Sequence, residues 1–314
     1  MHNTFEIMDG LFLIDFPLPI DGFEKFFSAW FFKDDMGRNI LIETGPASTI
    51  PILTDELSNL TDSLDYILLT HIHLDHSGGL GHLIKNYPAA KVFVSPRGRK
   101  HLVAPEKLWN ASVSTLGDIA EFYGRPMPVP SDVFLQDGGM IEGAEVFETP
   151  GHAPHHMTFR IPFRSKYLLF AGEAAGMTFP DTGALYLRPT TPPKLDARAA
   201  LSSLDLLSKV SSEDDVLCFA HFGCRENACQ IIAKAKEQLL SWLNDISGWR
   251  KNGMEKERMM ELLLSQDPLL ADFIKLPKKV QTRERFFINN SLQGFIGWIE
   301  ENERANNDNK GESA

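Results

Sequence analysis

The segment Thr70–Gly79 concentrates side chains that bind metals. Directly after an apolar run, four ligand-type residues occupy six positions: His71, His73, Asp75 and His76. Neutral imidazole is a strong ligand for zinc, iron, nickel or copper, and aspartate adds a harder, negatively charged oxygen donor. In an extended segment residues two apart share a side, so His71, His73 and Asp75 are predicted to share one face, with His76 pointing elsewhere. One loop could then serve two adjacent metals; the alternative is a polar turn that happens to be rich in histidine.

The segment resembles the His-x-His-x-Asp-His signature of the metallo-β-lactamase-fold hydrolases, which follows a β-strand and precedes Gly-Gly. Later elements resemble the same family: Thr149-Pro150-Gly151-His152, the run 167–172 followed by Glu173, and the run 216–219 followed closely by His221. The resemblance implies two divalent ions, zinc first, with iron or manganese as alternatives. The implied ligands are His71, His73 and His152 for the first metal, Asp75, His76 and His221 for the second, and Glu173 as the bridge.

Two positions depart from the pattern of that family. Glu173 stands where an aspartate is usual, which keeps the charge but adds one methylene of reach. Glu43, before Thr44-Gly45, also replaces an aspartate, and we expect it to support the ligands by hydrogen bonding rather than to bind metal. Both changes point to a wider metal site or to a different preferred metal, and the bridge could bind one metal or two.

The chemistry implied by this resemblance is hydrolysis by a metal-bound hydroxide, with Asp75 orienting the nucleophile. A small-molecule ester, thioester or lactone is the predicted substrate, because the Thr-Pro-Gly-His element looks most like that of glyoxalase-II-like and lactonase-like members. One alternative is an oxidoreductase similar to the persulfide dioxygenases of this fold, with one iron held by His71, His152 and Glu173. Another is a non-catalytic metal-binding protein.

The chain is predicted to be an α+β protein. The resemblance implies a four-layer αββα sandwich with the metals at one edge. Strand-like runs occur at 11–15, 29–32, 64–70, 91–95, 144–148 and 157–161, and residues 47–62 look helical, as does a stretch from about 79 to 86. The catalytic domain is predicted to cover residues 1–226.

From Asn227 onward the pattern changes to apolar residues at helical spacing, which predicts a C-terminal helical extension over residues 227–300. Its apolar residues must be buried against the catalytic domain, against a second subunit in a homodimer, or as a wall of the substrate pocket. The polar stretch 301–314 is predicted to be a disordered tail.

A Pro-rich connection spans residues 179–193, between Glu173 and His221. Because long connections near a site often carry function, Tyr186 and Arg188 are candidates for contacting the substrate. A structural turn held by prolines is the competing interpretation.

The composition limits the partners and the compartment. A net charge of −11 opposes binding to nucleic acid or to an anionic membrane. No secretory signal and no membrane-spanning run is evident, and only three cysteines occur: Cys218, Cys224 and Cys229. Such cysteine usage favours a reducing cytoplasm. Cys224 lies close to His221 in the sequence but is expected to be an ordinary thiol.

Overall fold

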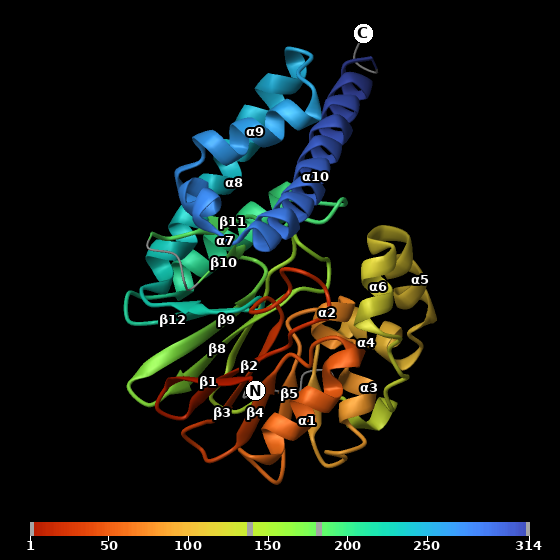
Figure 1. Ribbon diagram of the computed structural model, residues 1–314, viewed down its shortest axis with the longest axis vertical. Helices are drawn as coiled ribbons and strands as arrows, with labels where there is room; N and C mark the ends of the chain where they lie inside the picture. Colours follow the sequence, from red (N-terminus) through yellow and green to blue (C-terminus); the bar gives the residue numbers. More distant parts are fainter. Residues whose placement is uncertain (1–2, 137–140, 180–183, 312–314) are drawn as a thin grey trace.

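Two β-sheets lie face to face at the centre of the computed structural model, which describes residues 3–136, 141–179 and 184–311 (Figure 1). The first sheet has six strands in the order β1-β2-β3-β4-β5-β6. Strands β4 to β6 are parallel, and the other neighbours are antiparallel. The strands are β1 (Thr4–Met8), β2 (Leu11–Asp15), β3 (Ser28–Lys33), β4 (Asn39–Ile42), β5 (Tyr66–Leu68) and β6 (Lys91–Phe93).

The second sheet comes from the later part of the chain and has the order β13-β12-β9-β8-β7. Only the pair β9 and β12 is parallel. A separate two-stranded sheet joins β10 (Met177–Thr178) to β11 (Leu187–Arg188). The five strands are β7 (Glu145–Glu148), β8 (Met157–Phe163), β9 (Lys166–Gly172), β12 (Val216–Phe219) and β13 (Cys224–Arg225).

Alternate side chains of the strands fill the space between the two sheets. Trp30 and Phe32 of β3 point into this inner core, whereas Phe31 belongs to the core beneath the helices. Both faces of β3 are therefore covered, which explains why the run 29–32 is apolar without interruption. Phe32 stacks on Phe170 of the second sheet with ring centroids 5.5 Å apart.

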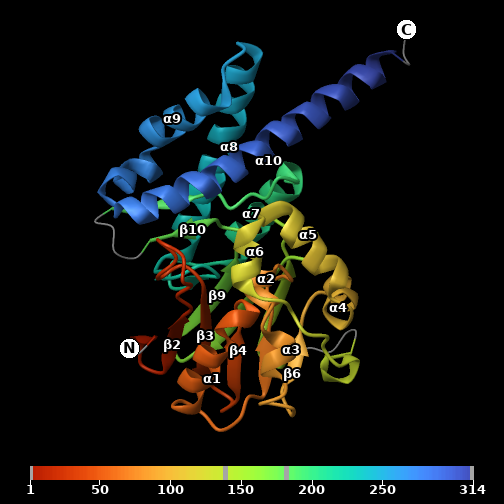
Figure 2. The same ribbon diagram turned by 45° about the vertical axis from the view of Figure 1, so that its right-hand side comes forward.

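Helices cover the outer faces of both sheets, so the predicted αββα sandwich is confirmed (Figure 2). Leu53 and Leu57 of α1 share a buried cluster with Leu41 of the first sheet, and Leu204 of α7 shares it with Leu217 of the second. The helices of this part are α1 (Ile50–Ser58), α2 (Leu74–Ser77), α3 (Leu80–Leu83), α4 (Pro96–Val103), α5 (Glu106–Leu116), α6 (Asp118–Tyr123) and α7 (Ala197–Val210), with 3-10 turns η1 (Ala47–Thr49) and η2 (Ser131–Val133).

The C-terminal part is helical, as its apolar spacing predicts. It contains α8 (Ala228–Lys251), α9 (Lys256–Gln266), the 3-10 helix η3 (Pro268–Lys275) and α10 (Lys278–Gly311). The apolar side chains of α8 share one buried cluster with α7 and the second sheet, which supports burial against the catalytic domain. A homodimer through these helices stays a prediction. No helix in the described part of the chain is long and apolar enough to cross a membrane.

Helix α10 continues through most of the stretch for which the sequence predicts disorder. It ends at Gly311, and residues 312–314 lie outside the described part, so a disordered tail stays a prediction. A helix once formed adds residues at little cost when no proline interrupts it. Arg250 of α8 also pairs with Glu300 and Glu303 at 3.1 Å, which fixes the helix where the polar stretch begins.

Tyr186 and Arg188 lie in a buried polar cluster under α10 rather than on an open surface. Their exposed fractions are 0% and 2%, and both donate to Oε2 of Glu284, at 2.9 and 2.6 Å. Arg283 donates to the other oxygen at 3.2 Å. The interpretation of Tyr186 and Arg188 as substrate contacts does not fit this arrangement, because their polar atoms face Glu284. They join the Pro-rich connection to α10 instead.

Replacing Glu284 with glutamine is expected to destabilise the protein by about 3–5 kcal/mol, because it leaves two buried guanidinium groups without their carboxylate. The guanidinium groups hold the pKa of Glu284 below its usual range although burial opposes this. The stabilisation is therefore complete above the pKa of an unfolded glutamate, about 4.3, and is lost as the pH falls through the folded value. Urea unfolding at several pH values measures it.

The matched control is Glu261→Gln, which breaks the exposed pair between Glu261 and Arg285. It should change the free energy of unfolding very little. Equal effects of the two substitutions would contradict the role given to the buried cluster.

Candidate metal centre

The ligand segment leaves the first sheet and turns into a helix within a few residues. Strand β5 ends at Leu68, and α2 begins at Leu74. The expectation that Asp75 shares a face with His71 and His73 is wrong, because the alternation of an extended chain stops at His73. Asp75 and His76 lie instead in one helical turn and join a second group of ligands.

The first group consists of His71, His73, His152 and Glu173. Nδ1 of His73 lies 3.1 Å from Nε2 of His71 and 3.0 Å from Nε2 of His152. The carboxylate oxygen Oε2 of Glu173 lies 3.2 and 2.9 Å from the same two Nε2 atoms. Ligands at about 2.0–2.1 Å from a tetrahedral zinc lie roughly 3.3 Å apart. The spacing of these four atoms is therefore close to that of a metal site.

The second group consists of Asp75, His76 and His221. Nε2 of His76 lies 3.3 Å from Oδ2 of Asp75, and Nε2 of His221 lies 3.0 Å from Oε1 of Glu173. The two oxygens of Glu173 thus face different groups, with the oxygen beside His71 also 3.5 Å from His76. The structure brings together all seven predicted ligands, and Glu173 lies between the two groups.

Hydrogen bonds set the tautomers of two ligands. Thr70 donates its hydroxyl proton to Glu43, so its oxygen can accept from Nδ1 of His71 at 3.0 Å. Nδ1 of His152 donates to the carbonyl of Thr190 at 2.7 Å. Both arrangements leave the Nε2 lone pair directed at the ligand cluster, as metal binding requires.

Glu43 occupies the supporting position that the sequence predicts for it. Its backbone has φ 67°, a left-handed conformation that is rare outside glycine, and this turns the side chain beneath the ligand segment. Burial raises the pKa of Glu43 to about 7, against the opposing effect of His76. Oε1 of Glu43 lies 3.9 Å from Nδ1 of His76, so the carboxylate adjoins both ligand groups.

His156, for which the sequence gave no role, holds the backbone of the bridging residue. The amide of Glu173 donates to Nε2 of His156 at 3.1 Å, and Nδ1 of His156 lies 2.8 Å from the hydroxyl of Thr149. Gly172 has φ +56°, and a Cβ there would collide with the His156 ring. The close approach of these two residues fixes where the Glu173 side chain begins.

The electrostatics of the cluster suit bound cations. Burial lowers the pKa of His73 to about 3, so its imidazole is neutral and able to donate a lone pair. Burial raises the pKa of Asp75, but His76 overrides this and lowers it to about 2. Both ring nitrogens of His76 are buried without a hydrogen-bond partner. Nitrogen and carboxylate donors that face one another in this way fit a pair of divalent ions.

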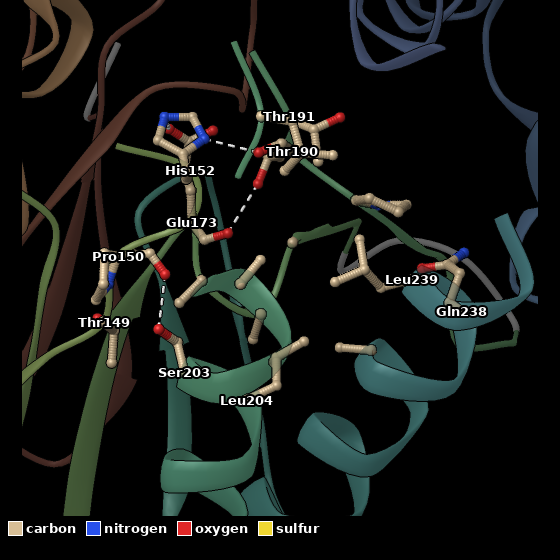
Figure 3. A pocket seen from close by; sticks show the side chains of 17 residues that line it. Thr149, Pro150, His152, Glu173, Thr190, Thr191, Ser203, Leu204, Gln238 and Leu239 are labelled. Carbon is tan, nitrogen blue, oxygen red and sulfur yellow. Dashed lines mark hydrogen bonds and ion pairs between the residues drawn. The ribbon is translucent and has the colours of Figure 1, made fainter. Parts of the chain in front are cut away.

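Part of the ligand cluster is exposed to solvent. His73, Asp75 and His152 are partly exposed, whereas the remaining ligands are buried. A cavity of about 30 Å³ lies between His152, Glu173 and helices α7 and α8 (Figure 3). It has room for roughly two waters.

Tyr123 of α6 is a further residue near the site that the sequence did not reveal. It is 1% exposed and meets the ring of Phe27 edge on, with centroids 5.3 Å apart. Burial, followed by the charges of Asp75 and Glu173, holds its pKa well above the usual range. No motif surrounds Tyr123 in the sequence, because its position depends on how α6 packs.

One protein-family model matches a stretch of this chain that includes all the predicted ligands. The family model of the metallo-beta-lactamase superfamily matches residues 26–221, from β3 to the last histidine of the cluster. The metallo-beta-lactamase fold-containing protein ST1585 of Sulfurisphaera tokodaii is 30% identical over 229 residues, which cover 67% of this chain and 80% of that protein. Its solved structure has a TM-score of 0.63 and 25% identity, covering 90% of this chain and 97% of that one.

Hydroxyacylglutathione hydrolases are also similar to this chain. The enzyme of Aeromonas salmonicida is 30% identical over 140 residues, which span 43% of this chain and only 42% of that protein. The structure of TTHA1429 from Thermus thermophilus has a TM-score of 0.62 at 21% identity, covering 95% of each chain, and supports the fold alone.

We expect His73→Ala and His152→Ala to lower the metal content and abolish metal-dependent activity, because each removes a nitrogen from the first group. Elemental analysis after dialysis measures the metal. Cys224→Ser is the control, since burial raises the pKa of Cys224 to about 11 and keeps it a thiol. A metal-depleted His152→Ala protein with full activity would overturn the role of the cluster.

Shortening the side chain of Glu173 should break its contact with one of the two ligand groups. Glu173→Asp draws the carboxylate back by about 1.5 Å, one carbon–carbon bond, so it can no longer approach His152 and His221 together. We expect metal content to fall below that of the unaltered protein. Glu148→Asp makes the same change at an exposed glutamate and should have no effect. An unchanged metal content in Glu173→Asp would show that the extra methylene is not needed.

Proposed function

Because this chain belongs to the metallo-beta-lactamase superfamily, we propose that it is a binuclear metal-dependent hydrolase of a small-molecule ester, thioester or lactone. The observation that carries the proposal is the position of Glu173. One oxygen faces His71 and His152, and the other lies 3.0 Å from His221. A carboxylate shared in this way supports two metals rather than one.

The residues present fit the metals that the family implies. His71, His73 and His152 would hold one ion, Asp75, His76 and His221 the other, and Glu173 would bridge them. When bound, such ions lower the pKa of a water toward about 7 and polarise the oxygen of the bond under attack. Zinc suits the nitrogen-rich donor set, and iron or manganese could also bind it.

Asp75 would orient the attacking water. Its carboxylate is partly exposed, and its low pKa keeps it ionised at neutral pH. An ionised carboxylate accepts a hydrogen bond from water and directs the oxygen lone pair toward the substrate. His76, 3.3 Å away, limits the rotation of Asp75.

The substrate class rests on the chemistry of the site and on the similar proteins. Hydroxyacylglutathione hydrolases, by their name, act on an acyl group carried by glutathione, and this chain resembles them over its catalytic part. We propose further that the substrate is a small molecule and that the protein acts in the cytoplasm. The absence of disulfides among Cys218, Cys224 and Cys229 supports the compartment.

A mononuclear iron dioxygenase is the second candidate. His71 and His152 both lie within 3.2 Å of the same oxygen of Glu173, which forms a set of two histidines and one carboxylate. The position of His73, 3.0–3.1 Å from both histidines, favours the hydrolase, because a fourth ligand there would occupy a coordination position.

Elemental analysis of protein purified without chelator, followed by assays of thioesters, lactones and phosphodiesters, tests the proposal. We expect close to two zinc or manganese ions per chain and turnover of an acyl substrate. One iron per chain, with oxygen consumption in the presence of a persulfide, would replace the hydrolase with the dioxygenase. Two ions with turnover of phosphodiesters alone would overturn the substrate class.

A further inference from the structure

His221 differs from two other ligands in how its ring is held. His71 and His152 each place Nδ1 against a hydrogen-bond partner, whereas Nδ1 of His221 is buried and has none. Metal-binding histidines usually depend on such a bond to fix the rotation of the ring. Another contact must therefore hold the plane of His221 so that Nε2 faces Glu173.

The ring of Phe26 lies flat against His221. The two centroids are 4.5 Å apart and the planes differ by 19°. The backbone keeps the two residues together, because the amide of Phe222 donates to the carbonyl of Phe26 at 3.0 Å and Phe27 pairs with His221 in an isolated bridge. Stacking of this geometry fixes the plane of a ring without any hydrogen bond.

Arg283 of α10 lies over the same phenyl ring. Its guanidinium carbon is 4.0 Å from the Phe26 centroid, and the side chain is 3% exposed. Phe26 therefore contacts both Arg283 and His221. A desolvated cation over an aromatic face is among the stronger contacts of this kind.

Further contacts keep Arg283 in place. It donates to the carbonyl of Gly22, in the loop that carries Phe26, and to Glu284. Gly22 has φ +86°, and a Cβ there would collide with the backbone of Lys279 in α10. The loop thus packs directly against α10, and the position of Phe26 depends on this helix.

We propose that α10 positions the second metal ligand group: Arg283 holds Phe26, and Phe26 holds the ring of His221. This inference deepens the proposed function, since it assumes that the second group binds a metal. Occupancy of the second metal therefore depends on the packing of a helix that contributes no ligand. Arg283 and Phe26 are positioning residues.

The test is metal titration of the apo-protein with Co²⁺, followed by calorimetry and visible absorption, for Phe26→Leu and Arg283→Met. Both variants should keep the affinity of the first site and weaken the second by about 10- to 100-fold, the usual effect of removing support behind a ligand. Arg283→Lys should restore part of the affinity, because lysine keeps the cation. Circular dichroism checks that each variant is folded.

Matched controls separate positioning from general loss of packing. Phe32 is as buried as Phe26 and stacks on Phe170 instead of a ligand, so Phe32→Leu should lower stability and keep both sites. Arg285→Met on the exposed side of α10 should change neither. In a His221→Ala background, Phe26→Leu should have no further effect on metal affinity, because the two act through one ring.

Unchanged second-site affinity in both variants, or equal weakening of the two sites, would overturn the inference and leave the hydrolase proposal intact. If unaltered protein binds no metal, the proposed function fails instead. If Arg283→Met does not fold, Arg283→Lys takes its place. If Phe26→Leu does not fold, the Arg283 variants alone give the decision.

Discussion

The contact on which the site depends is the approach of one carboxylate to two groups of histidines. Glu173 follows β9, and its two oxygens face ligands from the segment after β5, from α2, from the turn after β7 and from the loop after β12. These segments meet because the two sheets pack face to face, which brings Gly172 at the end of β9 beside Thr70 after β5. A buried carboxylate is costly without a cation beside it, so the packing that forms the site also favours the binding of positive ions there.

Residues that hydrogen-bond to the ligands restrict the positions and orientations of the ligand side chains. Glu43 acts through Thr70 on His71, Thr190 acts on His152, and His156 fixes the backbone of Glu173. These supports come from different parts of the catalytic domain, and each consists of one or two hydrogen bonds in a buried or partly buried place. A low local dielectric makes such bonds strong, and leaving one unpaired is correspondingly expensive.

Two buried sets of contacts join helix α10 of the C-terminal extension to residues near the metal ligands. Glu284 binds Tyr186 and Arg188 of the Pro-rich connection, and Arg283 lies over the ring that stacks on His221. The extension therefore packs on segments that adjoin the metal ligands, since Phe26 stacks on His221 and Thr190 of the Pro-rich connection is hydrogen-bonded to His152. Its apolar residues are buried against the catalytic domain, as the core-packing interpretation of their spacing requires.

The sequence alone determined the ligand types and their order along the chain, because His-x-His-x-Asp-His and Thr-Pro-Gly-His are local patterns. Apolar periodicity indicated strands and helices, and the αββα architecture came from the family resemblance that the two motifs carry. It also indicated the supporting place of Glu43. Only the tertiary structure decided that Asp75 joins His76 and His221, since the turn into α2 breaks the alternation of an extended chain. The places of Tyr186, Arg188, Tyr123 and Phe26 were likewise decided by packing between elements far apart in sequence, which no local pattern records.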